Sequence, residues 1–349
     1  MRYGTLLLRL LILVIVVTSG VPSWSAGSRD ISPGTGVRNS SLKRAPLIHH
    51  VLNVGPGRNL TKLSEAAALA RTGDTVVVDA GTYQGCAVWP KGVDFLTIES
   101  AGGAAVVTGP SCDYKGLFVI KGDHITVRGI TFTGAAAPHH NGAGIRAEGR
   151  DLNVESSQFI DNEEGILAAP NPDSTIVVRD SLFTGNGNCI EACAHGIYVG
   201  QIANLRIEHS RFFAQSTGHH VKSRAQRTEL TGNTIEDGAT GTASYLVDIP
   251  NGGALVMRNN SLEKGPLSDN PVVAVILGEE GVSNNTSEIV IESNFFKSDL
   301  ARETLFVSNQ TQTAAVLRGN VLTGQVKPLE GPGTVDDEVP ARTRIMVAP

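Results

Sequence analysis

Nine short apolar segments recur along the chain, and most of them lead into a Ser or Asn that precedes a large apolar residue by two positions. The first residues of successive segments lie 23 to 34 residues apart. A period in this range is typical of repeat proteins, whose units bury their apolar sides only by stacking on one another. The segments are 96–98, 125–127, 152–154, 176–178, 205–207, 228–230, 255–257, 289–291 and 315–317.

A second apolar segment follows most of these after a loop of variable length. Gly144, Gly165 and Gly196 each come just before such a segment, as expected where the backbone turns sharply into a strand. Repeats of short strands and turns stack at a strand spacing of roughly 4.8 Å. We therefore predict an all-β fold, a single-stranded right-handed parallel β-helix. The second segments are 117–119, 145–147, 166–168, 197–199, 221–223, 246–248, 275–277 and 305–307.

The two ends of the chain differ from this repeat. Residues 1–25 combine Arg2, an apolar run and small residues near Ser25, which predicts a secretory signal peptide. Residues 26–50 have no periodicity and are expected to be a flexible lead-in. A helical pattern over 60–72 predicts a short helix that caps the first rung of a β-helix domain at 51–324. Residues 325–349 are expected to be a poorly ordered tail.

Charge and cysteines narrow the function. The net charge of −5 argues against a general nucleic-acid binder, which needs a basic surface. We expect a secreted or periplasmic monomer with no membrane span after signal removal and no cofactor. Four cysteines in an exported chain allow three pairings into two disulfides, and proximity favours Cys86 with Cys112 and Cys189 with Cys193.

The start of the repeat region resembles a known family. The residues 54–57 (Val-Gly-Pro-Gly), 73–75 (Gly-Asp-Thr) and 80–83 (Ala-Gly-Thr-Tyr), together with the repeated strand pattern, are similar to pectin-lyase-like β-helix proteins. The resemblance implies an outer sheet face that binds a polysaccharide. It leaves the reaction open, because lyases, epimerases, hydrolases and non-catalytic proteins share this fold.

The segment around Lys222 gives the sharpest site hypothesis. If Val221 occupies the core position of Ile145, period-2 alternation sends His220, Lys222 and Arg224 outward together. The same count takes Leu246 as the core residue of the next strand. The register then places further polar side chains on this face: Arg146 and Tyr198 two rungs or more before Lys222, His195 on the preceding rung and Tyr245 on the following one.

These residue types predict chemistry on an acidic sugar. Neighbouring like charges should lower the pKa of Lys222 or His220, so that either could act as a base. Arg224 and Arg146 could neutralise a uronate carboxylate, which makes the C5 proton removable. Tyr198, Tyr245 or His195 could donate a proton. His219 and His140, the latter in a long loop expected to wall the same face, complete the predicted substrate-binding set.

Other reactions fit the sequence less well. The Gly218–His220 segment is similar to the paired-His motif of alginate epimerases but lacks the preceding Asp. Calcium-dependent pectate lyases need an acidic cluster on this face, and the sequence shows none. Hydrolysis needs two carboxylates, whereas Asp248 is expected to face inward and Glu164 to lie in a solvated turn. His139 and His140 have no third ligand at suitable spacing, so no metal site is predicted.

The sequence therefore favours an exported enzyme that acts on an acidic, uronate-containing polysaccharide by removing the C5 proton. A lyase is favoured over a C5-epimerase. The alternative is a non-catalytic protein that binds or assembles such a polysaccharide at the cell surface or in the periplasm. A binding protein would tolerate Lys222→Arg, whereas an enzyme with a lysine base would not.

Overall fold

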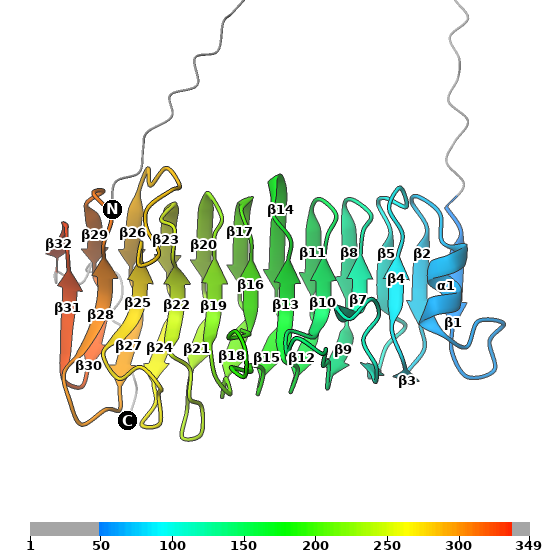
Figure 1. The fold of residues 1–349 in the computed structure, drawn as a ribbon, viewed down its shortest axis with the longest axis horizontal. Coiled ribbons are helices and arrows are strands. Elements are labelled where there is room, and N and C mark those ends of the chain that lie inside the picture. Colours follow the sequence, from blue (N-terminus) through cyan, green and yellow to red (C-terminus); the bar gives the residue numbers. More distant parts are fainter. Residues whose placement is uncertain (1–48, 337–349) are drawn as a thin grey trace, which may run out of the picture. The chain divides into compact units, whose positions relative to one another are not determined.

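The computed structural model describes residues 49–336, and these form the predicted parallel β-helix (Figure 1). The predicted signal peptide and nearly all of the predicted lead-in lie outside the described residues. The strands build three sheets of 12, 10 and 10 strands, called here sheets 1, 2 and 3, and every pairing within them is between successive rungs. This arrangement confirms the fold expected from the repeat.

Sheet 1 contains most of the first apolar segments of the repeat. Its strands are β1 (Val51–Val54), β2 (Thr75–Val78), β5 (Thr97–Ser100), β8 (Ile125–Arg128), β11 (Leu152–Glu155), β14 (Asn171–Arg179), β17 (Ile202–Glu208), β20 (Arg227–Thr231), β23 (Ala254–Arg258), β26 (Ile289–Glu292), β29 (Ala315–Arg318) and β32 (Gly333–Asp336).

Sheet 2 contains the second apolar segments and the predicted site residues. Its strands are β4 (Ala87–Trp89), β7 (Gly116–Ile120), β10 (Ala143–Ala147), β13 (Glu164–Ala168), β16 (Ile197–Val199), β19 (His219–Ser223), β22 (Tyr245–Ile249), β25 (Val273–Leu277), β28 (Thr304–Asn309) and β31 (Val326–Glu330).

Sheet 3 holds the large apolar residues that follow each Ser or Asn. Its strands are β3 (Gly81–Gln84), β6 (Ala105–Thr108), β9 (Ile130–Thr133), β12 (Gln158–Ile160), β15 (Leu182–Thr184), β18 (Arg211–Phe213), β21 (Thr234–Glu236), β24 (Ser261–Lys264), β27 (Phe295–Ser298) and β30 (Val321–Thr323).

Ladders of identical side chains explain the repeated motif. Phe159, Phe183 and Phe212 stack with ring centroids 4.5 Å apart in the core. At the corner between sheets 1 and 3, the backbone N–H of Asn233 donates to Asn260 Oδ1 (2.9 Å), and that of Asn260 donates to Asn294 Oδ1 (3.0 Å). The buried corner therefore satisfies its own backbone donors.

The two ends of the described region have different structures. The helix α1 (Leu63–Leu69) packs Leu63, Ala66 and Ala67 onto the first rung, which confirms the predicted cap (Figure 1). At the other end, β31 and β32 pair with β28 and β29. The prediction of a poorly ordered tail is therefore wrong for residues 326–336, and residues 337–349 lie outside the described part. Within residues 49–336 no helix is both long and apolar enough to span a bilayer.

Two disulfides join the pairs that proximity favoured. Cys86 bonds Cys112, and Cys189 bonds Cys193. The first pair ties the loops around β4 and β7, and the second closes a small ring within the loop before β16. The cysteines therefore act as local clips in residues 49–336.

Candidate active site

The outer face of sheet 2 brings together most of the predicted site residues. The strand register aligns Arg146, Leu167, Tyr198, Lys222 and Asp248 in one column across five successive rungs. Tyr198 pairs directly with Lys222, so it lies one rung away and closer than predicted. Arg146 lies three rungs before Lys222, roughly 14 Å at the usual strand spacing.

A kink near the start of these strands changes which side chains point outward. The N–H groups of Gly165 and Ile166, two consecutive residues, both donate to the next strand, at His195 O (3.1 Å) and Gly196 O (3.2 Å). A regular strand would use alternate residues for one neighbour. A Cβ placed on Gly165 would lie 2.9 Å from the ring of Phe183, so this position faces the core, as does Ile166.

The prediction that His220 shares the outer face with Lys222 and Arg224 is wrong. His220 occupies the strand position of Gly165 and Gly196 and is fully buried. Its Nε2 lies 2.9 Å from Oδ1 of the buried Asp237, and its ring meets Phe212 edge to face. A ring fits here because the phenylalanine ladder ends at Phe212 and continues with the smaller Ile235.

Asp248 was predicted to face inward, and this is also wrong. Because of the kink, Val247 and not Leu246 pairs with Val221, so Asp248 aligns with Lys222. Asp248 Oδ2 lies 3.0 Å from Lys222 Nζ. Asp248 is fully buried, and burial raises its pKa to about 7 although Lys222 opposes the shift.

Glu280 reaches the same place from a turn 58 residues along the chain. Lys222 Nζ donates to Glu280 Oε1 (2.8 Å), and Arg224 Nη2 donates to Glu280 Oε2 (2.6 Å). Arg224 also donates from Nε to the hydroxyl of Tyr198 (2.8 Å) and from Nη1 to Asn251 Oδ1. One carboxylate is therefore held between a lysine and an arginine beside a tyrosine hydroxyl.

The charge balance of the site differs from the predicted basic patch. Asp248, Glu279 and Glu280 bring carboxylate oxygens within 4.8 Å of one another, so the prediction that this face has no acidic cluster is wrong. Burial favours a lower pKa for Lys222, but Asp248 and Glu280 together raise it above its ordinary value. The prediction of a lowered lysine pKa is wrong for this closed arrangement, in which Lys222 is a cation.

Three neighbouring rings flank Lys222 on the same face. His195 stacks on His219 (4.6 Å between centroids), and His219 lies 4.9 Å from Tyr245. The Nδ1 atoms of His195 and His219 accept the backbone N–H groups of His219 and Tyr245. Burial, then Lys222, lowers the pKa of His219 to about 3, so it is neutral and carries its proton on Nε2, 3.5 Å from Asp248.

The buried Glu164 contradicts its predicted place in a solvated turn. It begins β13, and its Oε1 is buried without a hydrogen-bond partner. Burial raises its pKa well above the ordinary range, opposed by a backbone N–H of His195 and by the charges of Arg146 and Lys222. Burial therefore favours the neutral carboxylic acid form of Glu164.

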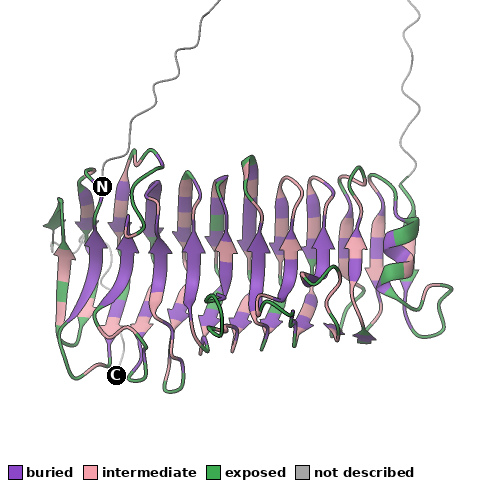
Figure 2. Ribbon diagram, viewed as in Figure 1, coloured by how far each residue is buried: buried purple, intermediate pink, exposed green. Residues whose placement is uncertain are grey.

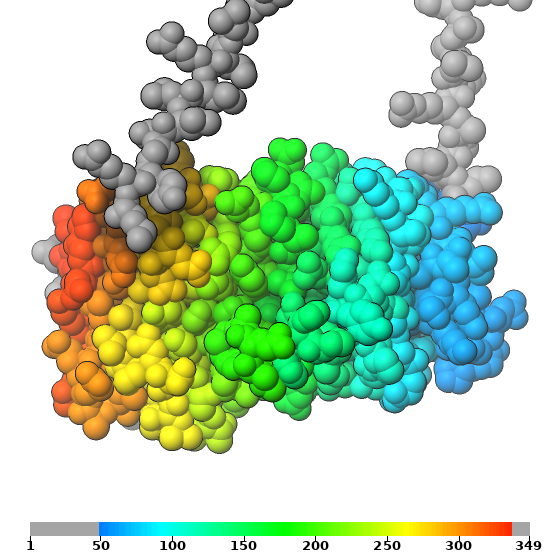
Figure 3. Space-filling view, in the orientation of Figure 1, coloured from blue at the N-terminus to red at the C-terminus, as the bar shows by residue number. Residues whose placement is uncertain are grey.

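Loops shelter this face, so its strands are buried over much of their length (Figure 2). The two loops predicted to wall the face lie against each other through Glu163. Its Oε2 accepts the N–H groups of Ala137 and Gly142 (both 2.8 Å), and Asn188 Nδ2 donates to its Oε1 (3.4 Å). Figure 3 shows residues near 190, in bright green, standing out over sheet 2.

His140 belongs to this wall and not to the Lys222 group. Its Nδ1 lies 3.3 Å from Glu163 Oε1. Its predicted part in substrate binding therefore needs a ligand long enough to extend from Lys222 to the loop, and the same holds for Arg146.

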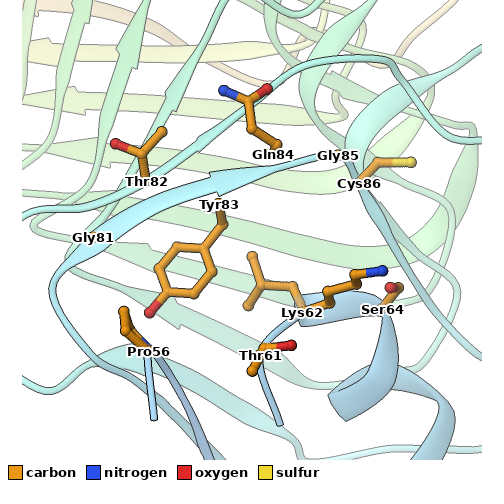
Figure 4. A pocket seen from close by; sticks show the side chains of 11 residues that line it. Pro56, Thr61, Lys62, Ser64, Gly81, Thr82, Tyr83, Gln84, Gly85 and Cys86 are labelled. Atoms are coloured by element: carbon orange, nitrogen blue, oxygen red, sulfur yellow. The ribbon is translucent and has the colours of Figure 1, made fainter. Parts of the chain in front are cut away.

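A separate cavity of about 480 Å³ lies between α1 and β3, far along the chain from Lys222 (Figure 4). Of the residues that line it, only Lys62 carries a charge. The hydroxyl of Tyr83 donates to the backbone oxygen of Asp79 (2.7 Å) and is therefore used by the fold. This cavity offers no group of titratable side chains for catalysis.

Comparison with known proteins assigns the family. A family model described as "Periplasmic copper-binding protein (NosD)" matches residues 70–262, more than half of the chain. The chain belongs to the NosD family. The match includes Tyr198, Lys222 and Asp248, whereas Glu280 lies beyond it. No curated protein matches the sequence.

A solved structure shows the same β-helix fold. An alginate lyase from Paenibacillus sp. str. FPU-7 is similar with a TM-score of 0.58 and 20% identity over 82% of this chain and 99% of that chain. The pectate lyase Pel9A has a TM-score of 0.49 and 15% identity over 84% and 82% of the two chains. Identities this low show a shared fold alone.

The described residues do not fit the copper ion in the name of the NosD family. Copper in proteins prefers imidazole, thiolate and thioether ligands. In residues 49–336 the group of three potential ligands consists of carboxylates, and Lys222 Nζ lies between two of them. The cysteines of this region are in disulfides, and backbone N–H groups use the Nδ1 atoms of His195 and His219.

Sequence reasoning placed Asp248 on the wrong face and missed Glu279 and Glu280. The Gly-Glu-Glu-Gly sequence at 278–281 indicates a turn that carries two carboxylates. Its position beside Lys222 depends on how the turn after β25, two rungs further on, folds back, which the repeat does not encode.

Proposed function

We propose that the protein is an exported polysaccharide lyase that cleaves a uronate-containing polymer by removing the C5 proton on the outer face of sheet 2. The observation that carries this proposal is the convergence of Lys222, Arg224 and the Tyr198 hydroxyl. Arg224 Nε binds Tyr198 Oη at 2.8 Å, and Tyr198 and Lys222 occupy adjacent rungs. A carboxylate neutraliser, a base and a proton donor are therefore neighbours.

The roles follow from the contacts of each group. Arg224 binds the uronate carboxylate and withdraws charge from C5. Once Glu280 has left, Lys222 passes one proton to Asp248 Oδ2, which lies 3.0 Å away, and its free amine then takes the C5 proton. The C5–H electron pair forms the C4–C5 double bond, and the C4–O bond breaks. Tyr198 gives its proton to the departing oxygen. His220, the other predicted base, is buried away from this face.

Hydrolysis is a second candidate because two carboxylates at the site have pKa values shifted in opposite directions. Burial raises the pKa of Asp248 to about 7. Burial also acts to raise that of Glu280, but Lys222 and Arg224 lower it below its ordinary value. An acid–base pair of this kind is typical of glycosidases. We rank it second because Asp248 is fully buried behind Lys222.

Incubation with a panel of uronate polysaccharides tests the proposal. We expect ultraviolet absorbance from unsaturated products with the wild-type protein and its loss in Tyr198→Phe and Lys222→Ala. Lys121→Ala serves as the control, because Lys121 forms a surface ion pair with Asp113. Solvent deuterium at C5 without cleavage would identify an epimerase instead. Binding without either signal would identify the non-catalytic alternative.

A further inference from the structure

We propose that Glu280 acts as an internal substitute for the substrate carboxylate, and that the turn carrying it must swing away before a uronate can bind. This inference rests on the proposed function and adds a gate to the same site. Lys222 and Arg224 are the charged groups best suited to bind a substrate carboxylate, and both already bind the carboxylate of Glu280.

The contacts of Glu280 match those expected of a bound uronate. Its two oxygens lie 2.8 Å from Lys222 Nζ and 2.6 Å from Arg224 Nη2. Two-point binding of a carboxylate by cations is strong and geometrically specific. The Glu280 side chain is 41% exposed, whereas those of Lys222 and Arg224 are 11% and 20% exposed. The glutamate thus lies between both cations and the solvent, and an incoming anion must replace it.

The turn that carries Glu280 has the features of a movable element. Gly281 N–H donates to Gly278 O (3.0 Å), which makes Glu279 and Glu280 the central residues of a four-residue turn. Gly278 and Gly281 both have positive φ, at 86° and 94°, a conformation that glycine adopts without strain. Residues 280–283 are exposed. Residues 279–283 are held to the preceding rung by the N–H groups of Glu280 and Ser283, which donate to Pro250 O and Asn251 O (both 3.0 Å), and by Asn251 Nδ2, which donates to Gly281 O (3.3 Å). Rotation of the turn must break these hydrogen bonds.

The segment on the far side of the turn is fixed and can act as its hinge. The side chain of Asn284 is buried, and its Nδ2 donates to Arg224 O (3.1 Å) and Gly252 O (3.3 Å). Asn284 holds the base of the turn while residues 279–283 move. Opening would leave Lys222 and Arg224 as the basic site that the sequence predicted.

The structure offers a matched control for Glu280. Glu288 also binds an arginine far back in the chain, with Oε1 2.5 Å from Arg227 Nη1, and its side chain is 42% exposed. This pair lies at the entry to sheet 1, away from Lys222. Glu288→Gln removes a comparable ion pair without touching the proposed gate.

Calorimetric titration with a mannuronate hexamer, together with hydrogen exchange of residues 278–283, tests the gate. We expect Glu280→Gln to bind the hexamer at least fivefold more tightly than wild type and to exchange faster in the turn, whereas Glu288→Gln matches wild type in both. Hexamer binding by wild type with no gain in Glu280→Gln would overturn the gate and leave the proposed function intact. Absence of binding to wild type and Glu280→Gln alike would overturn the gate for a mannuronate ligand, and the panel of uronate polysaccharides then decides the proposed function separately.

Discussion

Lys222 is the residue on which the chemistry of the site depends, because four charged or aromatic groups surround its ammonium. Asp248 Oδ2 lies 3.0 Å from it, Glu280 accepts its hydrogen bond, Tyr198 lies on the preceding rung, and His219 lies on the same strand. In the closed arrangement these neighbours keep Lys222 charged. A lysine base therefore requires that Glu280 leave first.

Substitution of Lys222 separates catalysis from binding. Lys222→Arg keeps the charge but cannot serve as a base, so we expect kcat to fall by roughly 10² to 10⁴-fold with little change in hexamer binding. On the same preparation, steady-state kinetics measures kcat and calorimetry measures the affinity for the hexamer. A variant that keeps full activity would show that Lys222 only holds the substrate.

The pH dependence of kcat/KM should report the environment of Lys222. Asp248 and Glu280 raise its pKa against the effect of burial, and Arg224 and neutral His219 also face it. The rate should therefore rise with pH through neutrality into the alkaline range. Removing the Glu280 carboxylate favours the neutral amine of Lys222. The rise of kcat/KM with pH should therefore begin at a lower pH in Glu280→Gln than in wild type. An unshifted rise would contradict this assignment of the base.

Glu164 should make the protein less stable as the pH rises. Its folded-state pKa is raised by burial above an unfolded value of about 4.3, so its contribution to stability is complete below that pH and is lost above it. Glu164→Gln should remove this loss, so the variant should be more stable relative to wild type at pH 8 than at pH 4.5. Urea unfolding at pH 4.5 and pH 8 measures the difference, and the exposed Glu330→Gln should show none.

At the scale of the element, stacked strands were easy to predict and their local kinks were not. The ladder of Asn233, Asn260 and Asn294 follows directly from the repeat, because each rung places the same side chain at the same corner. The kink at His220 leaves no such mark. The three preceding rungs have glycine there (Gly144, Gly165 and Gly196), so period-2 counting from those rungs had no side chain to show that two consecutive residues face the core. Later rungs have Leu246, Ala274 and Phe306 at this position, each buried next to a buried valine.

The partners of Lys222 could be predicted only in part for the same reason. Tyr198, Arg224 and Tyr245 follow from strand register, which repetition specifies. Asp248 depends on the kink, and Glu280 on a turn whose length differs from those of other rungs. The position of a side chain in such a turn depends on contacts specific to that rung, and these contacts cannot be predicted from the repeat.

The asparagine ladder should contribute strongly to stability. Asn260→Ala leaves the N–H of Asn233 without its acceptor and Leu230 O without its donor, both buried. We expect a loss of roughly 2–4 kcal/mol in the free energy of unfolding. Thermal and urea unfolding measure it against Asn285→Ala, a substitution at an exposed position. A loss equal to that of the control would mean that the ladder is redundant.

At the scale of the whole molecule, the β-helix supplies a rigid sheet and the loops supply the chemistry. Sheet 2 fixes Tyr198 and Lys222 on neighbouring rungs, the loops around Glu163 wall one side, and the turn at Glu280 covers the cations. An anionic polymer long enough to reach Arg146 would extend along several rungs.

The mass of the oligosaccharides released from polymannuronate tests the account most directly. Elimination leaves a double bond at C4–C5 of the new end, so the account predicts products lighter by one water than the corresponding saturated oligosaccharides, absent from Lys222→Ala. Saturated products heavier by one water would instead assign cleavage to Asp248 and Glu280 as a hydrolytic pair and would contradict C5-proton removal by Lys222.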